Sequence, residues 1–483
     1  MRFTMYKLLP ITMMVIGIAT VVQSQFSPIA NFDGTNGGNP RYMTLAQGLD
    51  GNFYGTTYSG GANGVGVMFQ LKAGTITALH TFSGVAPDGS YPVAGLVLAT
   101  NSKFYGTTEL GGGGGGGTIF SMTPLGIFTT LHQFNGTDGV DPEGALIESA
   151  SGGLYGTAQA GGSGSGGTVF KMTPAGVLST VYSFTGLGGD GEFPFSSLVQ
   201  GSDGKFYGTT YAGGGNLCNC GTVYRVTPAG AIKILHSFGA GGSFLDGSQP
   251  IGGLVQGLDG NFYGTTPGGG GQSGGSGTVF QITPAGVLTT LHAFAGYPGD
   301  GALPYAGLTL GSDGNLYGTT YQGGSQSPAC NCGTLYQIAT DGTYRMMYSF
   351  TNGTDGRNPY GGLLQATDGS FYGTTFAGGS NLSPHCQYSG DQTCGVIFRL
   401  SVGLPRFVTN LPKAAKVATA VKILGTGLSG ATSVSFNGTP AAFVMVSSHQ
   451  ITTSVPAGAA SGYVTVTTPS GTFTSNVPFQ VLP

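Results

Sequence analysis

The chain has 483 residues, a formal net charge of −3 and only 7% charged residues, whereas globular proteins usually contain about 25%. Glycine is the commonest residue with 94 copies, but it follows no Gly-X-Y period, and 39% of the residues are hydrophobic. This composition excludes collagen and argues against a disordered chain. It is typical of a β-rich protein with many tight turns, whose polarity comes from serine, threonine, asparagine and the backbone.

The N-terminal segment has the pattern of a secretory signal peptide. Arg2 and Lys7 flank a short basic region, an apolar run extends from Leu8 to Val22, and Ser24 offers a small-residue cleavage site. An uncleaved membrane anchor is the alternative, but the run is short for a span of about 20 apolar residues. We therefore predict that residues 1–24 are a cleaved signal peptide, that no transmembrane segment remains, and that the protein is secreted or held at the cell surface.

A pentapeptide with the sequence Phe-Tyr-Gly-Thr-Thr, or a close variant, recurs seven times at intervals of 50 to 56 residues. A period of about this length is typical of repeat architectures. A glycine inside a strand marks close backbone approach, and the Phe and Tyr before it point to opposite faces of the strand. The pentapeptide is therefore predicted to pack neighbouring repeats together rather than to form a site. The copies begin at Phe53, Phe104, Leu154, Phe206, Phe262, Leu316 and Phe371.

The fourth repeat predicts a four-stranded antiparallel meander. Its Asp203-Gly204 pair lies between the first two strands and is a strong hairpin signal, because the central residues of type I′ turns need positive φ. The apolar and alternating segments around this turn predict the strands. They are residues 197–200, 205–211, 222–226 and 232–238.

The two ends of the repeat array indicate a closed ring. Residues 27–32 resemble a fourth strand and precede the first complete repeat, whereas the last repeat has a third strand at 395–401 and no fourth. The N-terminal strand can complete the last sheet and so remove exposed sheet edges. A β-propeller has roughly 4 to 8 such blades; the alternative, a parallel β-helix, does not join its rungs by two-residue hairpins. We therefore predict an all-β fold with a seven-bladed β-propeller over residues 25–402.

The repeat consensus combines Asp-Gly-x-Phe-Tyr-Gly-Thr-Thr, a Gly-Gly loop and Gly-Thr-Val-Phe-x-(Ile/Met/Val)-Thr-Pro-Ala-Gly. In these motifs residues 26–402 resemble the choice-of-anchor tandem repeat (GloVer) family of bacterial exported proteins. The resemblance implies a propeller-like exported protein, often attached to the cell surface by varied C-terminal signals, and it supplies no catalytic residues. The chain departs from the family in having no recognisable anchor.

At Leu404 the period stops, and short β-branched segments separated by Gly and Pro turns predict a small immunoglobulin-like β-sandwich over residues 404–483. Residues 423–438, 455–458 and 462–466 resemble the IPT/TIG immunoglobulin-like domain. Such domains serve as spacers and binding modules in surface proteins and as DNA-contacting modules in some transcription factors. The signal peptide argues against a role on DNA.

The charges of this C-terminal domain are all positive. It carries Arg406, Lys413, Lys416 and Lys422 and no acid, whereas the rest of the chain is acidic. This asymmetry could help the two domains dock or face an anionic surface. Four dispersed cations are more commonly a solvated face, which is the interpretation that we favour.

Six cysteines in an exported chain predict disulfides rather than catalytic thiols. They form three pairs, each in the same loop of a different repeat, just after the pentapeptide. A metal site would need four convergent ligands, and His385 is the only histidine near any pair. The exact pairing stays open, because a Cys-x-Cys ring is strained. The pairs are Cys218 and Cys220, Cys330 and Cys332, and Cys386 and Cys394.

The ionisable residues show no catalytic pattern. Of the 19 acids, 13 are Asp followed directly by Gly, as expected for turn residues. A glycosidase needs two facing carboxyl groups, and Asp141 and Glu143 are close in sequence but lie in a connection with nothing to mark a site. One carboxylate per loop is too few for calcium. We predict no catalytic residue, no metal and no cofactor.

Four of the histidines share one repeat position, Leu-His-x-Phe, with tyrosines of other repeats. A position that accepts either side chain is expected to pack against the protein rather than to react. The histidines are His80, His132, His236 and His292, and the tyrosines are Tyr182 and Tyr348.

The repeats differ most in the loop between their second and third strands, and a binding site is expected there. All seven loops should emerge on one face of the ring. We hypothesise that this face binds an extracellular glycan or protein by aromatic stacking and neutral hydrogen bonds; packing at the loop base is the alternative. The candidate residues begin these loops: Tyr58, Tyr211, Tyr321 and Phe376, where other repeats have Glu109, Gln159 and Pro267.

Three functional classes follow. We expect an exported, non-catalytic binding or surface-structural protein, monomeric, acting on an extracellular glycan or protein and not on nucleic acid. The alternative is a propeller enzyme, a hydrolase or lyase of extracellular polysaccharide, which would require residues such as Arg41, Arg357, Glu109 and Glu192 to converge at the channel mouth. A purely architectural surface protein, the third class, predicts no pocket chemistry.

Overall fold

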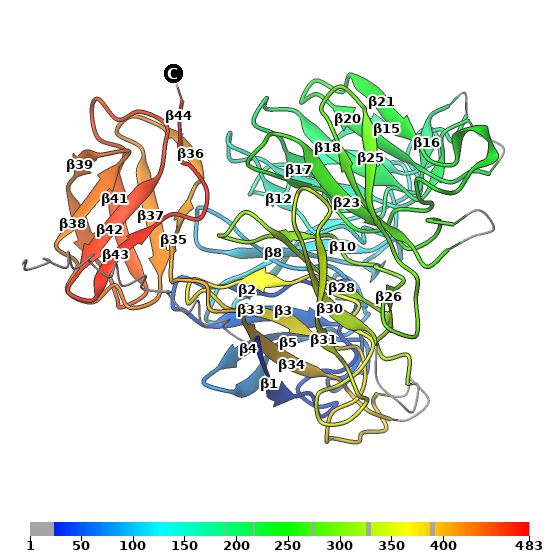
Figure 1. Ribbon diagram of the computed structural model, residues 1–483, viewed down its shortest axis with the longest axis horizontal. Coiled ribbons are helices and arrows are strands. Elements are labelled where there is room, and N and C mark those ends of the chain that lie inside the picture. Colours follow the sequence, from blue (N-terminus) through cyan, green and yellow to red (C-terminus); the bar gives the residue numbers. More distant parts are fainter. Residues whose placement is uncertain are drawn as a thin grey trace, which may run out of the picture.

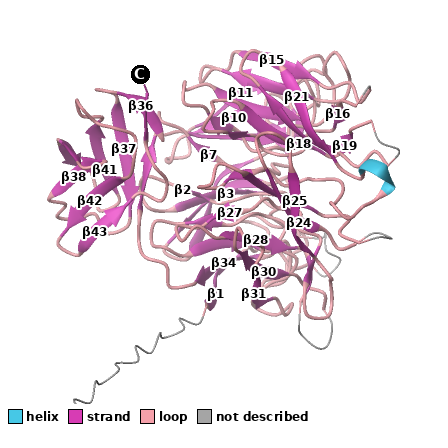
Figure 2. Cartoon of the chain, turned by 45° about the horizontal axis from the view of Figure 1, so that its top comes forward, coloured by secondary structure: helices cyan, strands magenta, loops and turns pink. Residues whose placement is uncertain are grey.

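The computed structural model describes residues 24–187, 189–215, 218–271, 275–324, 330–386 and 392–482. The predicted signal peptide, apart from Ser24, lies outside these ranges. Within them the chain is almost entirely strand and loop (Figure 2), with one short 3-10 helix, η1 (Ala240–Gly242). The predicted all-β class is confirmed.

Before residue 402 the described residues form seven four-stranded antiparallel sheets, which we number 1 to 7 along the chain. Sheet 1 contains β2 (Ala46–Gln47), β3 (Phe53–Thr57), β4 (Val67–Lys72) and β5 (Thr75–Thr81). Sheet 2 contains β7 (Val97–Leu98), β8 (Phe104–Thr108), β10 (Thr118–Met122) and β11 (Phe128–Gln133). Sheet 3 contains β12 (Ile147–Glu148), β13 (Leu154–Ala158), β14 (Thr168–Met172) and β15 (Leu178–Ser183). Sheet 4 contains β17 (Val199–Gln200), β18 (Phe206–Thr210), β20 (Thr222–Val226) and β21 (Ile232–Ser237).

The later sheets repeat this order. Sheet 5 contains β22 (Val255–Gln256), β23 (Phe262–Thr266), β24 (Thr278–Ile282) and β25 (Leu288–Ala293). Sheet 6 contains β27 (Thr309–Leu310), β28 (Leu316–Thr320), β30 (Thr334–Ile338) and β31 (Tyr344–Ser349). Sheet 7 contains β32 (Leu364–Gln365), β33 (Phe371–Thr374), β34 (Val396–Ser401) and β1 (Gln25–Asn31). Short two-stranded ladders join β6 (Gly89–Ser90) to β9 (Leu110–Gly111), β16 (Gly191–Glu192) to β19 (Ala212–Gly213), and β26 (Gly301–Ala302) to β29 (Gln322–Gly323).

The two ends of the repeat array meet in sheet 7. Strand β1 pairs antiparallel with β34, from Gln25 opposite Ser401 to Asn31 opposite Val396. The N-terminal strand therefore supplies the fourth strand that the last repeat lacks, as its sequence predicted. Figure 1 shows the dark blue β1 beside the brown β34, on the far side of the molecule from β15 and β21. We call the boundary between sheets 7 and 1 the seam.

The Tyr and Phe of the pentapeptide bridge neighbouring sheets. The Tyr ring of one copy packs on the Phe ring of the next copy, a contact that buries large apolar faces between sheets. At the seam the same contact joins Phe53 of sheet 1 to Tyr372 of sheet 7 with ring centroids 4.3 Å apart. The other observed pairs are Tyr54–Phe104 at 4.3 Å, Tyr155–Phe206 at 4.0 Å, Tyr207–Phe262 at 3.9 Å and Tyr317–Phe371 at 4.0 Å.

The glycine of the pentapeptide has no room for a side chain. A Cβ atom on Gly264 would lie 2.6 Å from Cζ of Phe280 and 2.7 Å from Cδ2 of Leu254. The close approach is therefore made by the strand-three aromatic ring of the same sheet, which lies directly over the glycine, and not by the backbone of a neighbouring repeat as the sequence predicted. This contact needs glycine for space rather than for a special backbone conformation.

The first threonine of the pentapeptide ties each sheet to the next. Its hydroxyl donates to a backbone carbonyl in the connection that leads into the following sheet, as Thr265 does to Ala306 at 2.8 Å. Equivalent bonds join Thr56 to Ala94 at 2.8 Å, Thr157 to Ser196 at 2.9 Å and Thr319 to Gly361 at 3.0 Å. At the seam the corresponding hydroxyl, that of Thr374, is buried and has no hydrogen-bond partner in the described residues.

The aspartates of the Asp-Gly pairs also hold the repeat together. In the hairpin turns they accept a hydrogen bond from the pentapeptide tyrosine, as Asp50 does from Tyr54 at 2.7 Å. In the connections they face the Leu-His-x-Phe position: Nε2 of His80 lies 3.2 Å from Asp88, and the same imidazole stacks on Phe128 of the next sheet at 3.7 Å. The histidines therefore pack and pair, which matches their predicted structural role.

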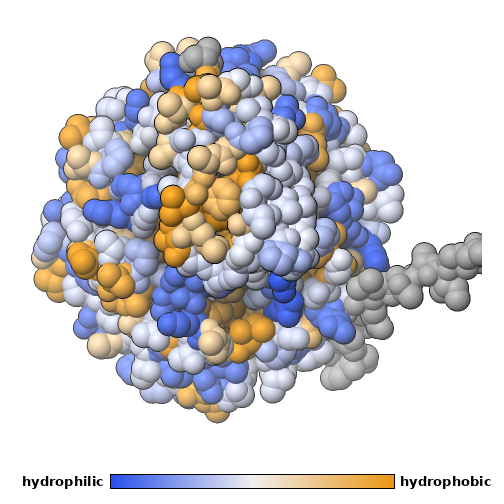
Figure 3. Space-filling model, turned by 90° about the vertical axis from the view of Figure 1, so that its left-hand side faces the viewer, coloured by the Kyte–Doolittle hydropathy of each residue, from blue (hydrophilic) through white to orange (hydrophobic). Residues whose placement is uncertain are grey.

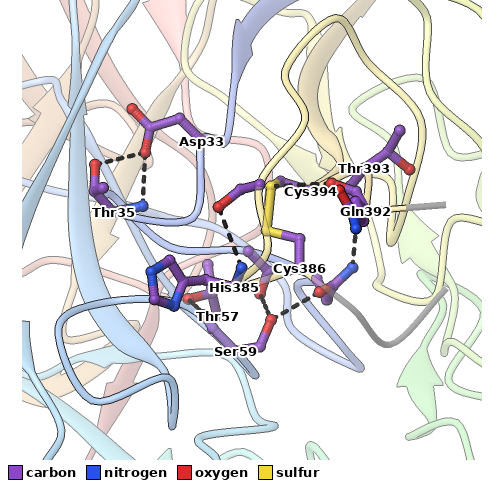
Figure 4. The surroundings of a disulfide bond; sticks show 12 residues. Asp33, Thr35, Thr57, Ser59, His385, Cys386, Gln392, Thr393 and Cys394 are labelled. Carbon is purple, nitrogen blue, oxygen red and sulfur yellow. Dashed lines mark hydrogen bonds between the residues drawn. A yellow bond between two sulfur atoms is a disulfide. The ribbon is translucent and has the colours of Figure 1, made fainter. Parts of the chain in front are cut away.

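The structure joins all six cysteines, as Cys218–Cys220, Cys330–Cys332 and Cys386–Cys394. The third disulfide lies at the seam, next to residues of sheet 1 such as Thr57 and Ser59 (Figure 4). The side chain of Asn39 reaches across the same boundary and donates to the carbonyl of Phe376 at 2.9 Å.

The C-terminal domain consists of two further four-stranded sheets that enclose one apolar core. One sheet contains β35 (Val408–Leu411), β37 (Ala420–Gly425), β41 (Gln450–Ser454) and β40 (Phe443–Met445), and the other contains β39 (Thr439–Ala441), β38 (Ser433–Phe436), β42 (Val464–Thr468) and β43 (Gly471–Thr474). Strands β36 (Ala414–Lys416) and β44 (Gln480–Leu482) pair in parallel. Figure 1 shows this orange-to-red domain beside the repeat sheets.

The C-terminal domain contacts the hairpin turns between the first and second strands of sheets 2 and 7. Nζ of Lys422 donates to the carbonyl of Thr100 at 2.7 Å, and the hydroxyls of Thr426 and Thr367 lie 2.7 Å apart. At least one of the four cations therefore docks the two domains instead of facing solvent. On its outer side (Figure 3) the domain shows apolar patches, and Val444 of edge strand β40 is 66% exposed.

Candidate functional site

The connections between sheets share a strained backbone position. In each connection the residue before a proline has a positive φ, which is uncommon for residues other than glycine. Phe193 illustrates how it is held: its N–H donates to Gly166 and its carbonyl accepts from Tyr211, both at 2.9 Å. The seven residues are Asn39, Tyr91, Asp141, Phe193, Gln249, Leu303 and Asn358, with φ between 51° and 57°.

These connections surround a central cavity of about 240 Å³. Each of the seven connections that lead into the sheets contributes at least one lining residue, so the cavity lies where the connections converge. One residue from each connection, in sheet order, is Tyr42, Gly95, Glu143, Phe195, Ile251, Tyr305 and Gly362. The wall combines positions that recur, such as the glycine three residues after the connection proline, with the position directly after that proline, at which the repeats differ.

Between its proline and the leucine that follows, the connection at the seam is one residue longer than the others. Leucine follows the connection proline after four positions in six repeats, but Leu45 follows Pro40 after five. The extra residue is accommodated by a second positive φ, 52° at Tyr42. This irregularity places Tyr42 in the wall of the cavity, with the guanidinium of Arg41 over its ring.

Arg41 lies among tyrosine rings. Its guanidinium carbon is 4.8 Å from the ring centroid of Tyr42, 5.5 Å from that of Tyr58 and 5.9 Å from that of Tyr360. These distances are within the range of cation–π attraction. The guanidinium is thereby held in place by aromatic faces.

Sheets 6, 7 and 1 form an aromatic wall. Tyr305 stacks on Tyr360 with centroids 5.1 Å apart, and Tyr360 also contacts Tyr321 at 4.3 Å and Tyr42 at 5.2 Å. The four rings are half-buried, so that each presents part of its surface outward. Burial raises the pKa of Tyr305, which keeps its phenol neutral.

Sheets 2 and 3 contribute an acidic side. Burial, followed by the charge of Glu109, raises the pKa of Glu143 to about 8, although Arg41 opposes this shift. Burial also raises the pKa of Glu109 and of Asp141. Oε2 of Glu109 is buried and has no hydrogen-bond partner in the described residues. We call Arg41, Tyr42, Glu109, Asp141, Glu143, Tyr305 and Tyr360 the mouth cluster.

The four aromatic residues proposed from the sequence occupy two layers. Tyr58 and Phe376 are buried, 8% and 6% exposed, beneath the mouth cluster. Tyr321 lies at the surface of the aromatic wall, and Tyr211 packs on Phe195 with centroids 5.4 Å apart. None of these positions tests the proposed binding role, which stays a prediction.

Tyr42, Tyr305 and Tyr360 were not anticipated from the sequence. They lie in the connections rather than in the loops between second and third strands. An available signal was the aromatic residue directly after the connection proline in Pro304-Tyr305 and Pro359-Tyr360. The one-residue extension at the seam was a second signal.

The convergence required for an enzyme is only partly observed. Arg41 and Glu109 are close enough to influence each other's charge. Glu192 lies in β16 and Arg357 bridges to Ala377. None of the four residues is among the described residues that line the cavity. No group of three potential ligands for a metal ion occurs in the described part of the chain.

The fold and the mouth cluster together define a propeller-like repeat protein with a C-terminal immunoglobulin-like module. The family model of the Gloeobacter/Verrucomicrobia repeat matches residues 18–218 and 188–385, and that of the IPT/TIG domain matches residues 406–481. The chain therefore belongs to the Gloeobacter/Verrucomicrobia repeat family and carries a C-terminal IPT/TIG domain. No curated protein matches the chain.

Among solved structures, a fungal alcohol oxidase of the AA5 family in complex with copper is similar at a TM-score of 0.51 and 12% identity, over 96% of this chain and 100% of that chain. At this identity the likeness concerns the fold alone. A putative 6-phosphogluconolactonase from Bacteroides uniformis is similar at a TM-score of 0.42 and 17% identity, over 72% of this chain and 98% of that chain. That value is too low to support an argument.

Proposed function

We propose that this protein is an exported, non-catalytic glycan-binding protein whose seven sheets are the blades of a closed propeller. The observation that carries the proposal is the half-buried tyrosine wall of Tyr42, Tyr305 and Tyr360 beside a central cavity. Aromatic faces pack against the C–H groups of a sugar ring, and phenol hydroxyls and backbone groups offer hydrogen bonds to its hydroxyls. Tyr58 and Phe376 form a layer that supports this wall.

Export is supported by the signal-like N-terminal sequence and by the three disulfides, which persist in oxidising compartments. No helix in the described part of the chain has the length and hydropathy needed to cross a membrane. In this proposal the IPT/TIG domain holds the propeller by its hairpin-turn side. The mouth cluster, at the opposite ends of the strands, is then open to an extracellular ligand.

The cavity also supports a second candidate, a hydrolase or lyase of extracellular polysaccharide. Glu143 lines the cavity, and a buried carboxyl group with a pKa of about 8 has the property of a general acid at neutral pH. This candidate predicts new saccharide ends when the protein is incubated with polysaccharide. It also predicts that Glu143→Gln abolishes their formation.

A glycan array with the mature protein, residues 25–483, tests the main proposal. The double variant Tyr305→Ala/Tyr360→Ala is expected to lose at least tenfold in affinity for whichever glycan binds. Tyr463→Ala, which removes a 42% exposed ring of the C-terminal domain, is the matched control and should bind normally. Unchanged binding by the double variant, or the absence of any bound glycan, would contradict the proposal.

A further inference from the structure

The central cavity is walled by all seven connections, which pack closely on one another. A Cβ atom on Gly253 would lie 2.5 Å from Oγ of Ser197 in the preceding connection, and one on Gly362 would lie 2.7 Å from Oγ1 of Thr44. A Cβ atom on a glycine would meet the neighbouring connection within 4 Å at six of the seven boundaries: Thr44–Gly95, Gly144–Ser196, Ser197–Gly253, Gly253–Gly307, Gly307–Gly362 and Gly362–Thr44. The wall therefore has no pair of gaps through which a chain could cross the cavity.

The cavity is also small. Its volume of about 240 Å³ lies below the roughly 300–1,000 Å³ of pockets that enclose drug-sized ligands. It has room for one sugar unit and not for a row of several units. A polysaccharide chain can therefore enter only along the axis about which the connections are arranged, and only with one of its ends.

Aromatic rings line the cavity on more than one side. Tyr305 lines it from the connection into sheet 6, Tyr42 from the connection into sheet 1, and Phe195 from the connection into sheet 4. The connections of Tyr42 and Phe195 are three positions apart in the ring of seven, so these two side chains lie across the cavity from each other. A sugar ring that enters along the axis meets aromatic faces, which pack well against its C–H groups.

Three polar side chains of the wall are not used by the protein itself. Thr44, Glu143 and Ser197 line the cavity, and no hydrogen bond joins their side chains to another described residue. Burial raises the pKa of Glu143 to about 8, so that at neutral pH its carboxyl group can donate a hydrogen bond as well as accept one. Glycines such as Gly253 and Gly307 leave the backbone of the wall bare, which is typical of places where a backbone approaches a ligand closely.

We propose that the cavity binds the terminal unit of a neutral hexose chain, inserted along the axis with its ring between Phe195 and Tyr305. The hydroxyl groups of this unit bond to the side chains of Thr44, Glu143 and Ser197. The inference rests on the proposed glycan-binding function and names the part of the glycan that is recognised. An internal unit is linked on both sides and has no route into the wall.

The wall also disfavours a charged terminal unit. Arg41, Glu109 and Asp141 are not among the described residues that line the cavity. A carboxylate or an ammonium group on the inserted sugar would lose its water without gaining an opposite charge, which is costly. The selectivity for a neutral unit therefore comes from the composition of the wall, and the selectivity for a chain end comes from its closure.

Titration calorimetry of the mature protein with linear hexamers tests the inference. The probes are hexamers of α-1,4-linked glucose, of β-1,4-linked glucose and of β-1,4-linked mannose. Each is offered intact, with its non-reducing end blocked by a 4,6-benzylidene acetal, and with its reducing end reduced to the alditol. One of the two modifications is expected to weaken binding at least tenfold and the other less than threefold, which identifies the inserted end. The cyclic α-1,4-linked hexamer of glucose, which has no end, is expected not to bind.

The variant Thr44→Val/Ser197→Ala removes two hydroxyls that hold no described residue. It should keep its thermal midpoint and bind the intact hexamer at least tenfold more weakly. Thr432→Val/Ser433→Ala makes the same two changes at exposed positions of the C-terminal domain and is the matched control, with unchanged affinity. Unchanged affinity of the Thr44→Val/Ser197→Ala variant would show that the sugar binds elsewhere and overturn the inference.

The remaining outcomes separate this inference from the proposed function. Equal affinities for all three forms of a hexamer, or tight binding of the cyclic hexamer, overturn recognition of a chain end and leave glycan binding intact. Binding of none of the hexamers, when the array identifies another glycan, also overturns the inference alone. An array without any bound glycan contradicts the proposed function itself.

Discussion

The contacts between sheets and the mouth of the central cavity differ in how far their residues recur from repeat to repeat. Between sheets, the pentapeptide makes the same contacts in copy after copy: Tyr on Phe, strand-three ring over Gly, Thr to the next connection. At the mouth, the residue after the connection proline is different in nearly every sheet. Repetition thus marks the contacts that hold neighbouring sheets together.

The difference shows where to look for function in a repeat protein. A contact present in every copy is a property of the architecture, because the ring needs it everywhere. A departure that occurs once, such as the longer connection at the seam with Arg41 and Tyr42, is not needed for packing. At the same boundary the buried hydroxyl of Thr374 lacks the hydrogen bond that the equivalent threonines make, which is a structural cost.

The largest expected difference between the two regions is in the unfolding free energy that is lost when an aromatic residue is replaced by alanine. Phe262→Ala removes a fully buried ring stacked on Tyr207 at 3.9 Å and should lower the free energy of unfolding by about 3–5 kcal/mol. Tyr305→Ala, at the half-buried mouth, should lower it by less than half that amount. Chemical denaturation measures both. Similar losses would remove the distinction between architecture and site.

A smaller effect is expected from the pentapeptide glycine. Gly264→Ala places a methyl group 2.6 Å from Phe280, and overpacking of a core costs about 1–3 kcal/mol. Gly113→Ala is the control, since its nearest neighbour is the flexible Gln133 side chain at 3.3 Å. A neutral Gly264→Ala in thermal denaturation would show that the ring above it can move away.

The first threonine of the pentapeptide allows a finer comparison, because its hydrogen bond to the next connection is missing at the seam. Thr265→Val removes a hydrogen bond to Ala306 and should destabilise the protein by about 1 kcal/mol. Thr374→Val, the same change at the seam, removes a buried hydroxyl without a partner and should be neutral or stabilising. Equal destabilisation in urea titrations would mean that the seam is an ordinary sheet boundary.

The smallest effect concerns pH. Burial raises the pKa of Asp88, but the hydrogen bonds from His80 and the Ser83 amide outweigh it and hold that pKa below its ordinary value of 3.8. His292 and backbone amides lower the pKa of Asp300 in the same way. A lowered pKa stabilises the folded state above the ordinary value, and this contribution is lost as the pH falls through the folded pKa.

Each of these partly buried carboxylates should contribute about 1 kcal/mol or less. Unfolding free energies measured from pH 6 to pH 2 should therefore decrease below about pH 4. Asp88→Asn/Asp300→Asn should show a smaller decrease over that range. An unchanged slope in the double variant would assign acid sensitivity to other groups.

The repeat itself was predictable because local and global signals agree in it. The Asp-Gly turns, the alternating strands and the period all indicate a four-stranded unit. Residues 27–32 resemble the fourth strand of this unit, and this resemblance predicted the pairing of the N-terminal strand with β34. The disulfide partners and the docking of Lys422 depend on three-dimensional proximity that spacing alone does not give. Lys422, which the sequence analysis assigned to a solvated face, makes a specific hydrogen bond to the carbonyl of Thr100.

The site was predictable only in part. The loop aromatics Tyr58 and Phe376 lie near the mouth but are buried under it, because the preceding connections fold over them. The tyrosines Tyr305 and Tyr360 follow connection prolines, where the chain turns at the positive φ of Leu303 and Asn358. That turn depends on hydrogen bonds to the neighbouring sheet, which a single repeat does not reveal.

The pairing of β1 with β34 sets the order in which the molecule can be completed. Asn31 and its partner Val396 are 365 residues apart, so at about 5–20 residues per second the ribosome needs roughly 20 to 75 s to make the second after the first. Throughout that time the first strand of the nascent chain is an unpaired edge. Sheet 7 is thus completed last, through the strand that is made first, and any factor that shields a newly made chain has most to protect at its beginning.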